Sequence, residues 1–217
     1  MWNAFKSLFA RFRDRGDSDP VFDEVRALVD ELLTQDFGDP AERRSKDESV
    51  IAVLERLGKE IETIKEQASG YYPDGTISAQ VWLNGAGYAN LSRKLTLHFR
   101  KAGWLAREEN ASALWARSTL AVCSHYHHMV GPAMLANADC QERLGHADRA
   151  AQMYRAVVAD FEFLLEEERA GVPLDEDERT AIESLRTALR RLLEIGTGLK
   201  DRERLEALLA SAQAVLK

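Results

Sequence analysis

Three of the chain's five histidines and one of its two cysteines lie within the segment VCSHYHHM, residues 122–129. Imidazole and thiolate groups bind zinc and iron, and they also act as bases and nucleophiles in catalysis. A metal site needs at least three ligands that converge on one point. The cluster therefore raises the question of whether this segment holds a metal, performs a reaction or belongs to a core.

Helical geometry separates the members of this cluster. At about 100° per residue, His125 and His128 share one face of a helix, whereas His127 lies on another face with Cys123. No single ion can bind all of them, so His125 and His128 are the candidates for any metal site. Further ligands would have to come from other helices, where the suitable side chains are His98, Asp139, Cys140, Glu142 and His146.

The residues around the cluster favour a structural role. Over 109–130 apolar side chains cover nearly the whole helical projection, which predicts one buried central helix that ends at Gly131 and Pro132. A nucleophile–base pair of Cys123 and His127 would have poor access in such a helix. We therefore expect these imidazoles to be hydrogen-bonded inside the protein, and we expect no catalytic residue, no bound metal and no cofactor.

The composition is that of a globular protein. The 217 residues are 45% hydrophobic and 30% charged, and no apolar stretch approaches the roughly 20 residues that span a bilayer. The net charge of −7 argues against a general nucleic-acid-binding protein, because phosphates would not be neutralised. Two cysteines make no disulfide scaffold, and no signal peptide is evident, so we expect a reduced cytoplasmic location.

Helical periodicity dominates the chain and predicts an all-α fold of about seven helices in antiparallel hairpins. A capping box of Ser45 and Glu48 indicates the start of the second helix. The segment 77–105 also shows strand-like alternation, but its helical stripe is favoured, with Gly85 and Gly87 allowing a close helix crossing. The other helices are expected at 21–33, 133–144, 147–168, 175–195 and 200–216.

The first residues, MWNAFKSLFARFRDR, predict a basic amphipathic helix. Its apolar stripe includes Trp2, Phe5, Phe9 and Phe12, which are the candidate partner-binding residues. This helix could dock on a partner protein, pack on its own domain, or lie in a membrane surface through residues 1–13.

Residues 134–161, MLANADCQERLGHADRAAQMYRAVVADF, resemble a tetratricopeptide repeat. The matching positions are Leu144 and Gly145 at the turn, the small Ala138 and Ala150, and Tyr154. Gly145 permits a left-handed turn, the two alanines let the helices approach closely, and Tyr154 fills the space beside them. A second and poorer match covers 84–104.

The resemblance implies a tetratricopeptide-like helical stack and a protein-binding role. We expect an N-terminal helix at 1–16, a helical hairpin at 17–69 and a tetratricopeptide-like region at 77–217, the last two forming one compact unit. The predicted function is that of a non-catalytic adaptor, chaperone or assembly component that binds a protein through a helical groove or through its N-terminal helix. The alternatives are a metal- or small-molecule-binding enzyme or sensor at His125 and His128, and a peripheral membrane protein. Self-association is left open.

Overall fold

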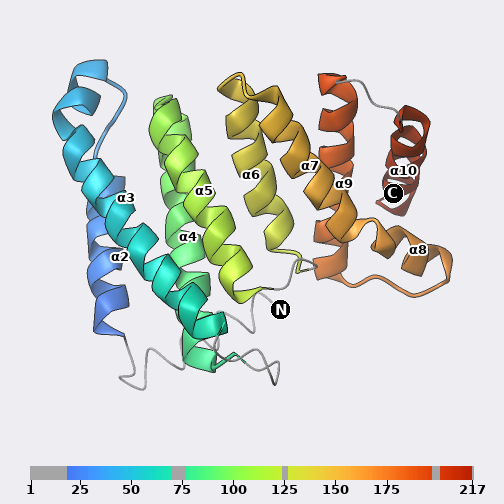
Figure 1. The fold of residues 1–217 in the computed structure, drawn as a ribbon, viewed down its shortest axis with the longest axis horizontal. Coiled ribbons are helices and arrows are strands. Elements are labelled where there is room, and N and C mark those ends of the chain that lie inside the picture. The colour runs from blue at the N-terminus through green and yellow to red at the C-terminus, as the bar shows by residue number, and fades with distance from the viewer. Residues whose placement is uncertain (1–18, 70–76, 124–126, 197–200, 217) are drawn as a thin grey trace. The chain divides into compact units, whose positions relative to one another are not determined.

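The computed structural model describes residues 19–69, 77–123, 127–196 and 201–216. These residues form helices α2 to α10 and contain no strand (Figure 1). The all-α prediction is therefore confirmed over this part of the chain, and helix is confirmed for residues 79–102 of the ambiguous segment 77–105. The N-terminal helix expected at 1–16 lies outside the described residues.

The described residues form two compact units, which divide between Val122 and Cys123. The ranges expected from the sequence, 17–69 and 77–217, are a different division and stay a prediction. Each unit has its own buried apolar side chains, so each is described separately below.

The first unit contains α2 (Pro20–Leu33), α3 (Pro40–Ser69), α4 (Ala79–Ala102) and α5 (Leu105–Val122). Helices α4 and α5 form a hairpin, α3 packs on both of them, and α2 packs on α3 and α4 (Figure 1). The fully buried large side chains at their centre include Phe37, Leu57, Ile61, Tyr88, Leu95 and Phe99. Burial of each such side chain stabilises the fold by about 1.5–3 kcal/mol.

Aspartate followed by proline starts both of the first two described helices. Asp19 caps α2, where its Oδ1 accepts from the Val21 amide at 2.9 Å. Asp39 does the same for α3, accepting from the Ala41 amide at 2.8 Å. The helix start expected at Ser45 is therefore wrong. Ser45 lies inside α3, where its hydroxyl donates to the Glu42 carbonyl, because the Asp39–Pro40 signal acts earlier in the chain.

The two glycines of α4 allow close helix packing, as predicted. A Cβ at Gly85 would lie 2.3 Å from Val122 Cγ1 of α5, and a Cβ at Gly87 would lie 2.5 Å from the Phe22 ring of α2. Neither distance is possible between real carbon atoms. Glycine at these positions lets α4 approach its neighbours by the width of a methyl group.

Two ion pairs hold α5 in its place. Glu108 is fully buried, and Arg100 of α4 donates to its Oε1 at 2.7 Å. Arg107 donates to both carboxylate oxygens of Asp47 in α3, at 2.7 and 2.9 Å. A bidentate pair fixes the relative positions of two helices because its geometry is specific. Removal of one partner of a buried pair is costly because the other charge is left uncompensated.

The end of the helix expected over 109–130 is wrong. Helix α5 ends at Val122, and α6 (Val130–Arg143) begins after the histidine segment. Pro132 was expected to end a helix, yet it lies in the first turn of α6. A proline in a first turn costs no intrahelical hydrogen bond, so Pro132 is a start signal.

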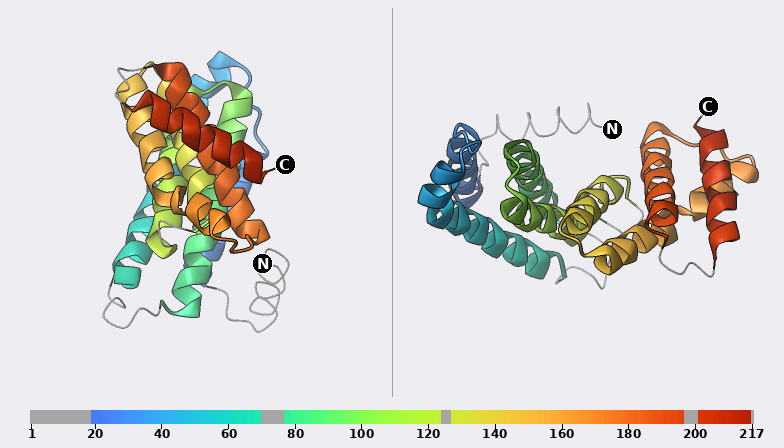
Figure 2. Two further views of the ribbon diagram at one scale, coloured as in Figure 1. Left: turned by 90° about the vertical axis from the view of Figure 1, so that its right-hand side faces the viewer. Right: turned by 90° about the horizontal axis from the view of Figure 1, so that it is seen from above.

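The second unit continues with α7 (Ala147–Phe161), α8 (Phe163–Arg169), α9 (Glu176–Ile195) and α10 (Arg202–Val215). Helices α6, α7 and α9 pack on one another, and α10 lies beside α9 (Figure 2, right). The range 147–168, expected as one helix, is divided at Glu162. The expected number of about seven helices is accordingly not confirmed.

Candidate functional site

The hairpin of α6 and α7 turns at Leu144, Gly145 and His146. Gly145 has φ +82°, the left-handed conformation predicted for it. Its amide donates to the Glu142 carbonyl and the His146 amide donates to the Gln141 carbonyl, both at 2.9 Å. These bonds satisfy the last carbonyls of α6, so the chain reverses directly into α7.

Small residues let the two helices of this hairpin pack closely. Ala138 of α6 and Ala150 of α7 are completely buried, and Tyr154 is 1% exposed. Tyr154 donates from its hydroxyl to Glu142 at 3.2 Å, and Arg191 of α9 binds the other oxygen of Glu142 at 2.5 Å. The hairpin is thus fixed to α9 by a network of polar contacts as well as by its apolar packing.

Tyr154 and Glu142 belong to this framework and do not form an acid–base pair. Burial raises the pKa of Tyr154 to about 12, so its hydroxyl keeps its proton at neutral pH. The Glu142 carboxylate accepts from that hydroxyl and from Arg191. The Tyr154 hydroxyl is therefore not poised to give its proton to a substrate.

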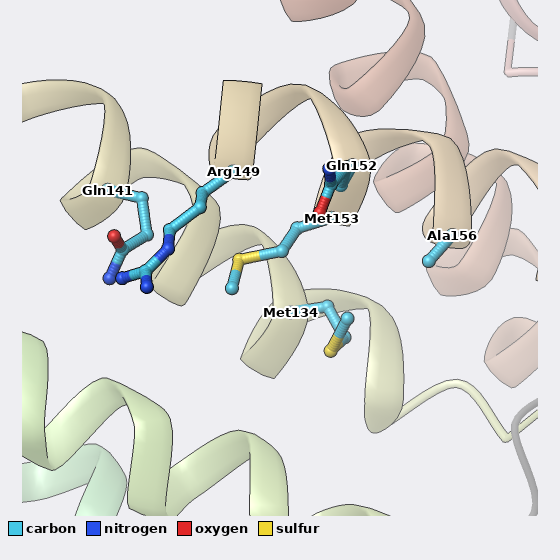
Figure 3. A pocket seen from close by; sticks show the side chains of 6 residues that line it. All are labelled: Met134, Gln141, Arg149, Gln152, Met153 and Ala156. Atoms are coloured by element: carbon cyan, nitrogen blue, oxygen red, sulfur yellow. The ribbon is translucent and has the colours of Figure 1, made fainter. Parts of the chain in front are cut away.

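The same hairpin carries a hollow of about 360 Å³. We call it the α6–α7 hollow (Figure 3). Its lining residues come from both helices and are Met134, Gln141, Arg149, Gln152, Met153 and Ala156. The size lies at the lower end of the range of about 300–1,000 Å³ that ligand sites occupy, which suits a short segment of a partner.

The hollow has an apolar part and a polar part. Met153 extends from α7 towards α6, where Met134 lies, whereas the Arg149 side chain lies alongside Gln141 (Figure 3). Gln141 is buried, and its Oε1 lies 2.9 Å from His146 Nδ1. The arrangement combines adaptable thioether surface with one exposed cation, which is suited to binding a peptide and supplies no nucleophile.

The candidate metal ligands do not converge in the described structure. His125 lies outside the described residues. His128 precedes α6, and its Nε2 is 3.6 Å from Asp177 Oδ1 of α9. The ring of His127 lies beside it, with 4.4 Å between the ring centroids. Across the ranges that the structure describes, no group of three or more His, Cys, Asp or Glu side chains could hold a metal ion.

The other side chains considered as ligands have separate surroundings. His98 of α4 packs against the ring of Phe37, with 5.4 Å between the centroids. Asp139 pairs with Arg143 on its own helix, at 3.6 Å. Glu142 and His146 take part in the hairpin contacts described above. The structure thus does not bring these groups together around His128.

The two cysteines are buried and are not joined in a disulfide. Burial raises the pKa of the Cys123 thiol to about 11, so little thiolate exists at neutral pH. Cys140 is fully buried in α6. Both behave as small apolar side chains, in agreement with the structural role that the sequence indicates.

Sequence reasoning did not single out the residues of the hollow. Arg149, Gln152, Met153 and Ala156 follow the i, i+3, i+4, i+7 rule, so they form a stripe on α7 distinct from its buried residues. Two methionines at positions that are only half-buried, beside a stripe of buried alanines, were the available signal. Such a pattern is hard to recognise before the partner helix is known.

No family model, curated protein or solved structure matches the chain. The described fold and candidate site define the chain as an all-helical protein with a small hollow on one helical hairpin. Among the described helices, none combines the length and apolar character of a membrane span.

Proposed function

We propose that this chain is a non-catalytic protein-binding module, an adaptor, chaperone or assembly component, which receives a segment of its partner in the α6–α7 hollow. The observation that carries the proposal is the hollow itself, with methionine side chains from two helices and a polar edge. Methionine adapts its shape to different apolar side chains, and it is common on surfaces that bind peptides.

The rigidity of the hairpin supports this role. The turn at Gly145, the buried alanines and the network of Tyr154, Glu142 and Arg191 hold α6 and α7 in one geometry. A preformed surface spends little free energy on ordering itself when a partner binds. The resemblance of 134–161 to a tetratricopeptide repeat points to the same role. The stretch 84–102 lies within the continuous helix α4, so it lacks the turn that a second repeat would require.

A photo-crosslinking experiment tests the proposal. A benzophenone amino acid at Ala156, in the hollow, should crosslink a defined partner in the native cell, and the recombinant partner should then bind the full chain in calorimetry. The same amino acid at Leu97, an exposed apolar position of α4, should not crosslink that partner.

A matched pair of variants completes the test. Met153→Asp places an acid in the hollow and should abolish binding of the recombinant partner. Val172→Asp makes a similar change at an exposed position after α8 and should leave binding intact. If both variants bind the partner as well as the unchanged protein does, the hollow is not the binding site.

Docking through the N-terminal segment is the second route by which a partner could bind. Trp2, Phe5, Phe9 and Phe12 lie outside the described residues, so this route stays a prediction. Deletion of residues 1–16 should weaken partner binding if the route is used. Flotation with liposomes, with and without the deletion, tests the membrane alternative, and elemental analysis of the purified chain tests the metal alternative at His125 and His128.

A further inference from the structure

The charge of the hollow indicates which segment it takes. Arg149 is its only charged lining residue, and no lining residue is acidic. The Arg149 guanidinium is exposed and makes no ion pair with any residue that the structure describes. Some other arginines of the same unit do make ion pairs, for example Arg191 with Glu142 and Arg204 with Glu162. Arg149 is therefore a cation that is available to a partner.

We propose that the α6–α7 hollow selects an acidic peptide segment, in which an apolar side chain contacts Met134 and Met153 and a nearby carboxylate binds Arg149. The inference rests on the proposed function and names the chemistry of the partner. Gln141 and Gln152, whose amides line the same hollow, provide polar surface beside the carboxylate.

The spacing of the lining residues defines the motif. Arg149 and Met153 are one helical turn apart, which is about 6 Å along α7. An extended peptide covers that length in about two residues, because each residue spans about 3.3 Å. The expected segment therefore has the form apolar, any residue, then Asp or Glu, in either chain direction.

The net charge of −7 does not prevent this recognition. At physiological ionic strength the Debye length is about 8 Å, so distant acidic groups of the chain are largely screened. A carboxylate in contact with Arg149 experiences mainly that guanidinium.

Selection from a random-peptide library displayed on phage tests the inference with the full chain as bait. Peptides with Asp or Glu two residues from an apolar residue should be enriched. With Arg149→Glu as bait, the enriched peptides should carry Lys or Arg in place of the acid. Arg155→Glu makes the same change on the exposed side of α7 away from the hollow, and it should retain the acidic preference.

A selected acidic peptide with a fluorescent label gives the quantitative test. Its affinity should fall about tenfold with Arg149→Glu, a change typical of one reversed charge contact. The affinity of the unchanged protein should also decrease as salt is added, more steeply than that of Arg149→Ala. Circular dichroism checks that each variant is folded.

The outcomes separate this inference from the proposed function. If peptides are enriched without an acidic residue, or if Arg149→Glu leaves the acidic preference unchanged, the charge selection is wrong while the hollow still binds peptides. If Met153→Asp remains folded and has no effect on any selected peptide, the hollow is not a peptide site and both proposals fail.

Discussion

Among single residues, Gly85 occupies the position at which packing most clearly excludes a side chain. The close approach of α4 to α5 leaves no space for a side chain there, since a Cβ would meet Val122 Cγ1 at 2.3 Å. The position thus reverses the usual rule that alanine stabilises the middle of a helix by about 1 kcal/mol relative to glycine.

We predict that Gly85→Ala lowers the free energy of unfolding by up to about 2 kcal/mol, because the gain in helix propensity of about 1 kcal/mol offsets only part of an overpacking cost of about 1–3 kcal/mol. Urea unfolding followed by circular dichroism measures the change. Adding Val122→Ala makes space for the new methyl group, so the double variant should lose less stability than the sum of the single variants. Strict additivity would contradict the contact.

His98 makes the stability of the first unit depend on pH. Partial burial lowers the pKa of His98 below the ordinary value, although a hydrogen bond to the Gln35 backbone and nearby Asp36 act in the opposite direction. The unfolded chain therefore binds the proton more readily than the folded chain does. The contribution of neutral His98 to the free energy of unfolding is fully present above its unfolded pKa of about 6.5. It decreases as the pH falls from there through the pKa of His98 in the folded state.

We predict that His98→Gln flattens the fall in stability between about pH 7 and pH 5, because it removes one group that binds its proton more tightly in the unfolded state. Chemical unfolding at a series of pH values measures the slope. Part of the slope should persist in the variant, since burial also lowers the pKa of His127 in the second unit. A variant whose slope equals that of the unchanged protein would show that His98 does not contribute.

Among the elements, those with a complete local signal could be predicted from the sequence. A helix was expected at 175–195, and α9 begins there with Asp175 as its cap, in a reciprocal capping box with Glu178. The left-handed turn at Gly145 was predicted for the same reason. Helix was favoured over strands for 77–105 because a helical stripe is present there and the segments on both sides are helical.

The predicted helix ends are wrong where the apolar periodicity continues across the end of a helix. The apolar projection over 109–130 continues from α5 into α6, so it concealed the break after Val122, and Pro132 was assigned to the wrong helix end. The hollow could not be predicted, because it depends on which faces of α6 and α7 remain uncovered once the core stripes have packed. Residue periodicity describes one helix and not the space between two helices.

The capping box of α9 provides a prediction at this scale. Asp175→Ala should lower the free energy of unfolding of the second unit by about 1 kcal/mol, because the Glu178 amide loses its acceptor at 2.9 Å. Asp175→Asn keeps an oxygen in place and should cost clearly less. Thermal unfolding of the two variants side by side measures the difference, and equal losses would contradict a capping role.

For the whole molecule, the two compact units suggest that stability is distributed over two cores. Leu95 is completely buried in the first unit and Leu189 in the second. Cores that are built separately are expected to open as separate cooperative segments.

We predict that Leu95→Ala, which should cost about 2–5 kcal/mol, accelerates amide hydrogen exchange in α2 to α5 and leaves α6 to α10 unchanged. Leu189→Ala should have the reciprocal effect. Exchange measured by mass spectrometry on peptides from each helix tests both variants. Faster exchange throughout the chain in either variant would show that the units unfold together.

The separation of the two stripes of residues on α7 has a consequence for engineering. The stripe that carries Arg149 and Met153 is separate from the one that buries Ala150 and Tyr154. Side chains on the first stripe can therefore be randomised without touching the contacts that keep the hairpin folded. A library of variants at those positions would make this hairpin a scaffold with changeable binding specificity. The contacts that stabilise its fold would be kept.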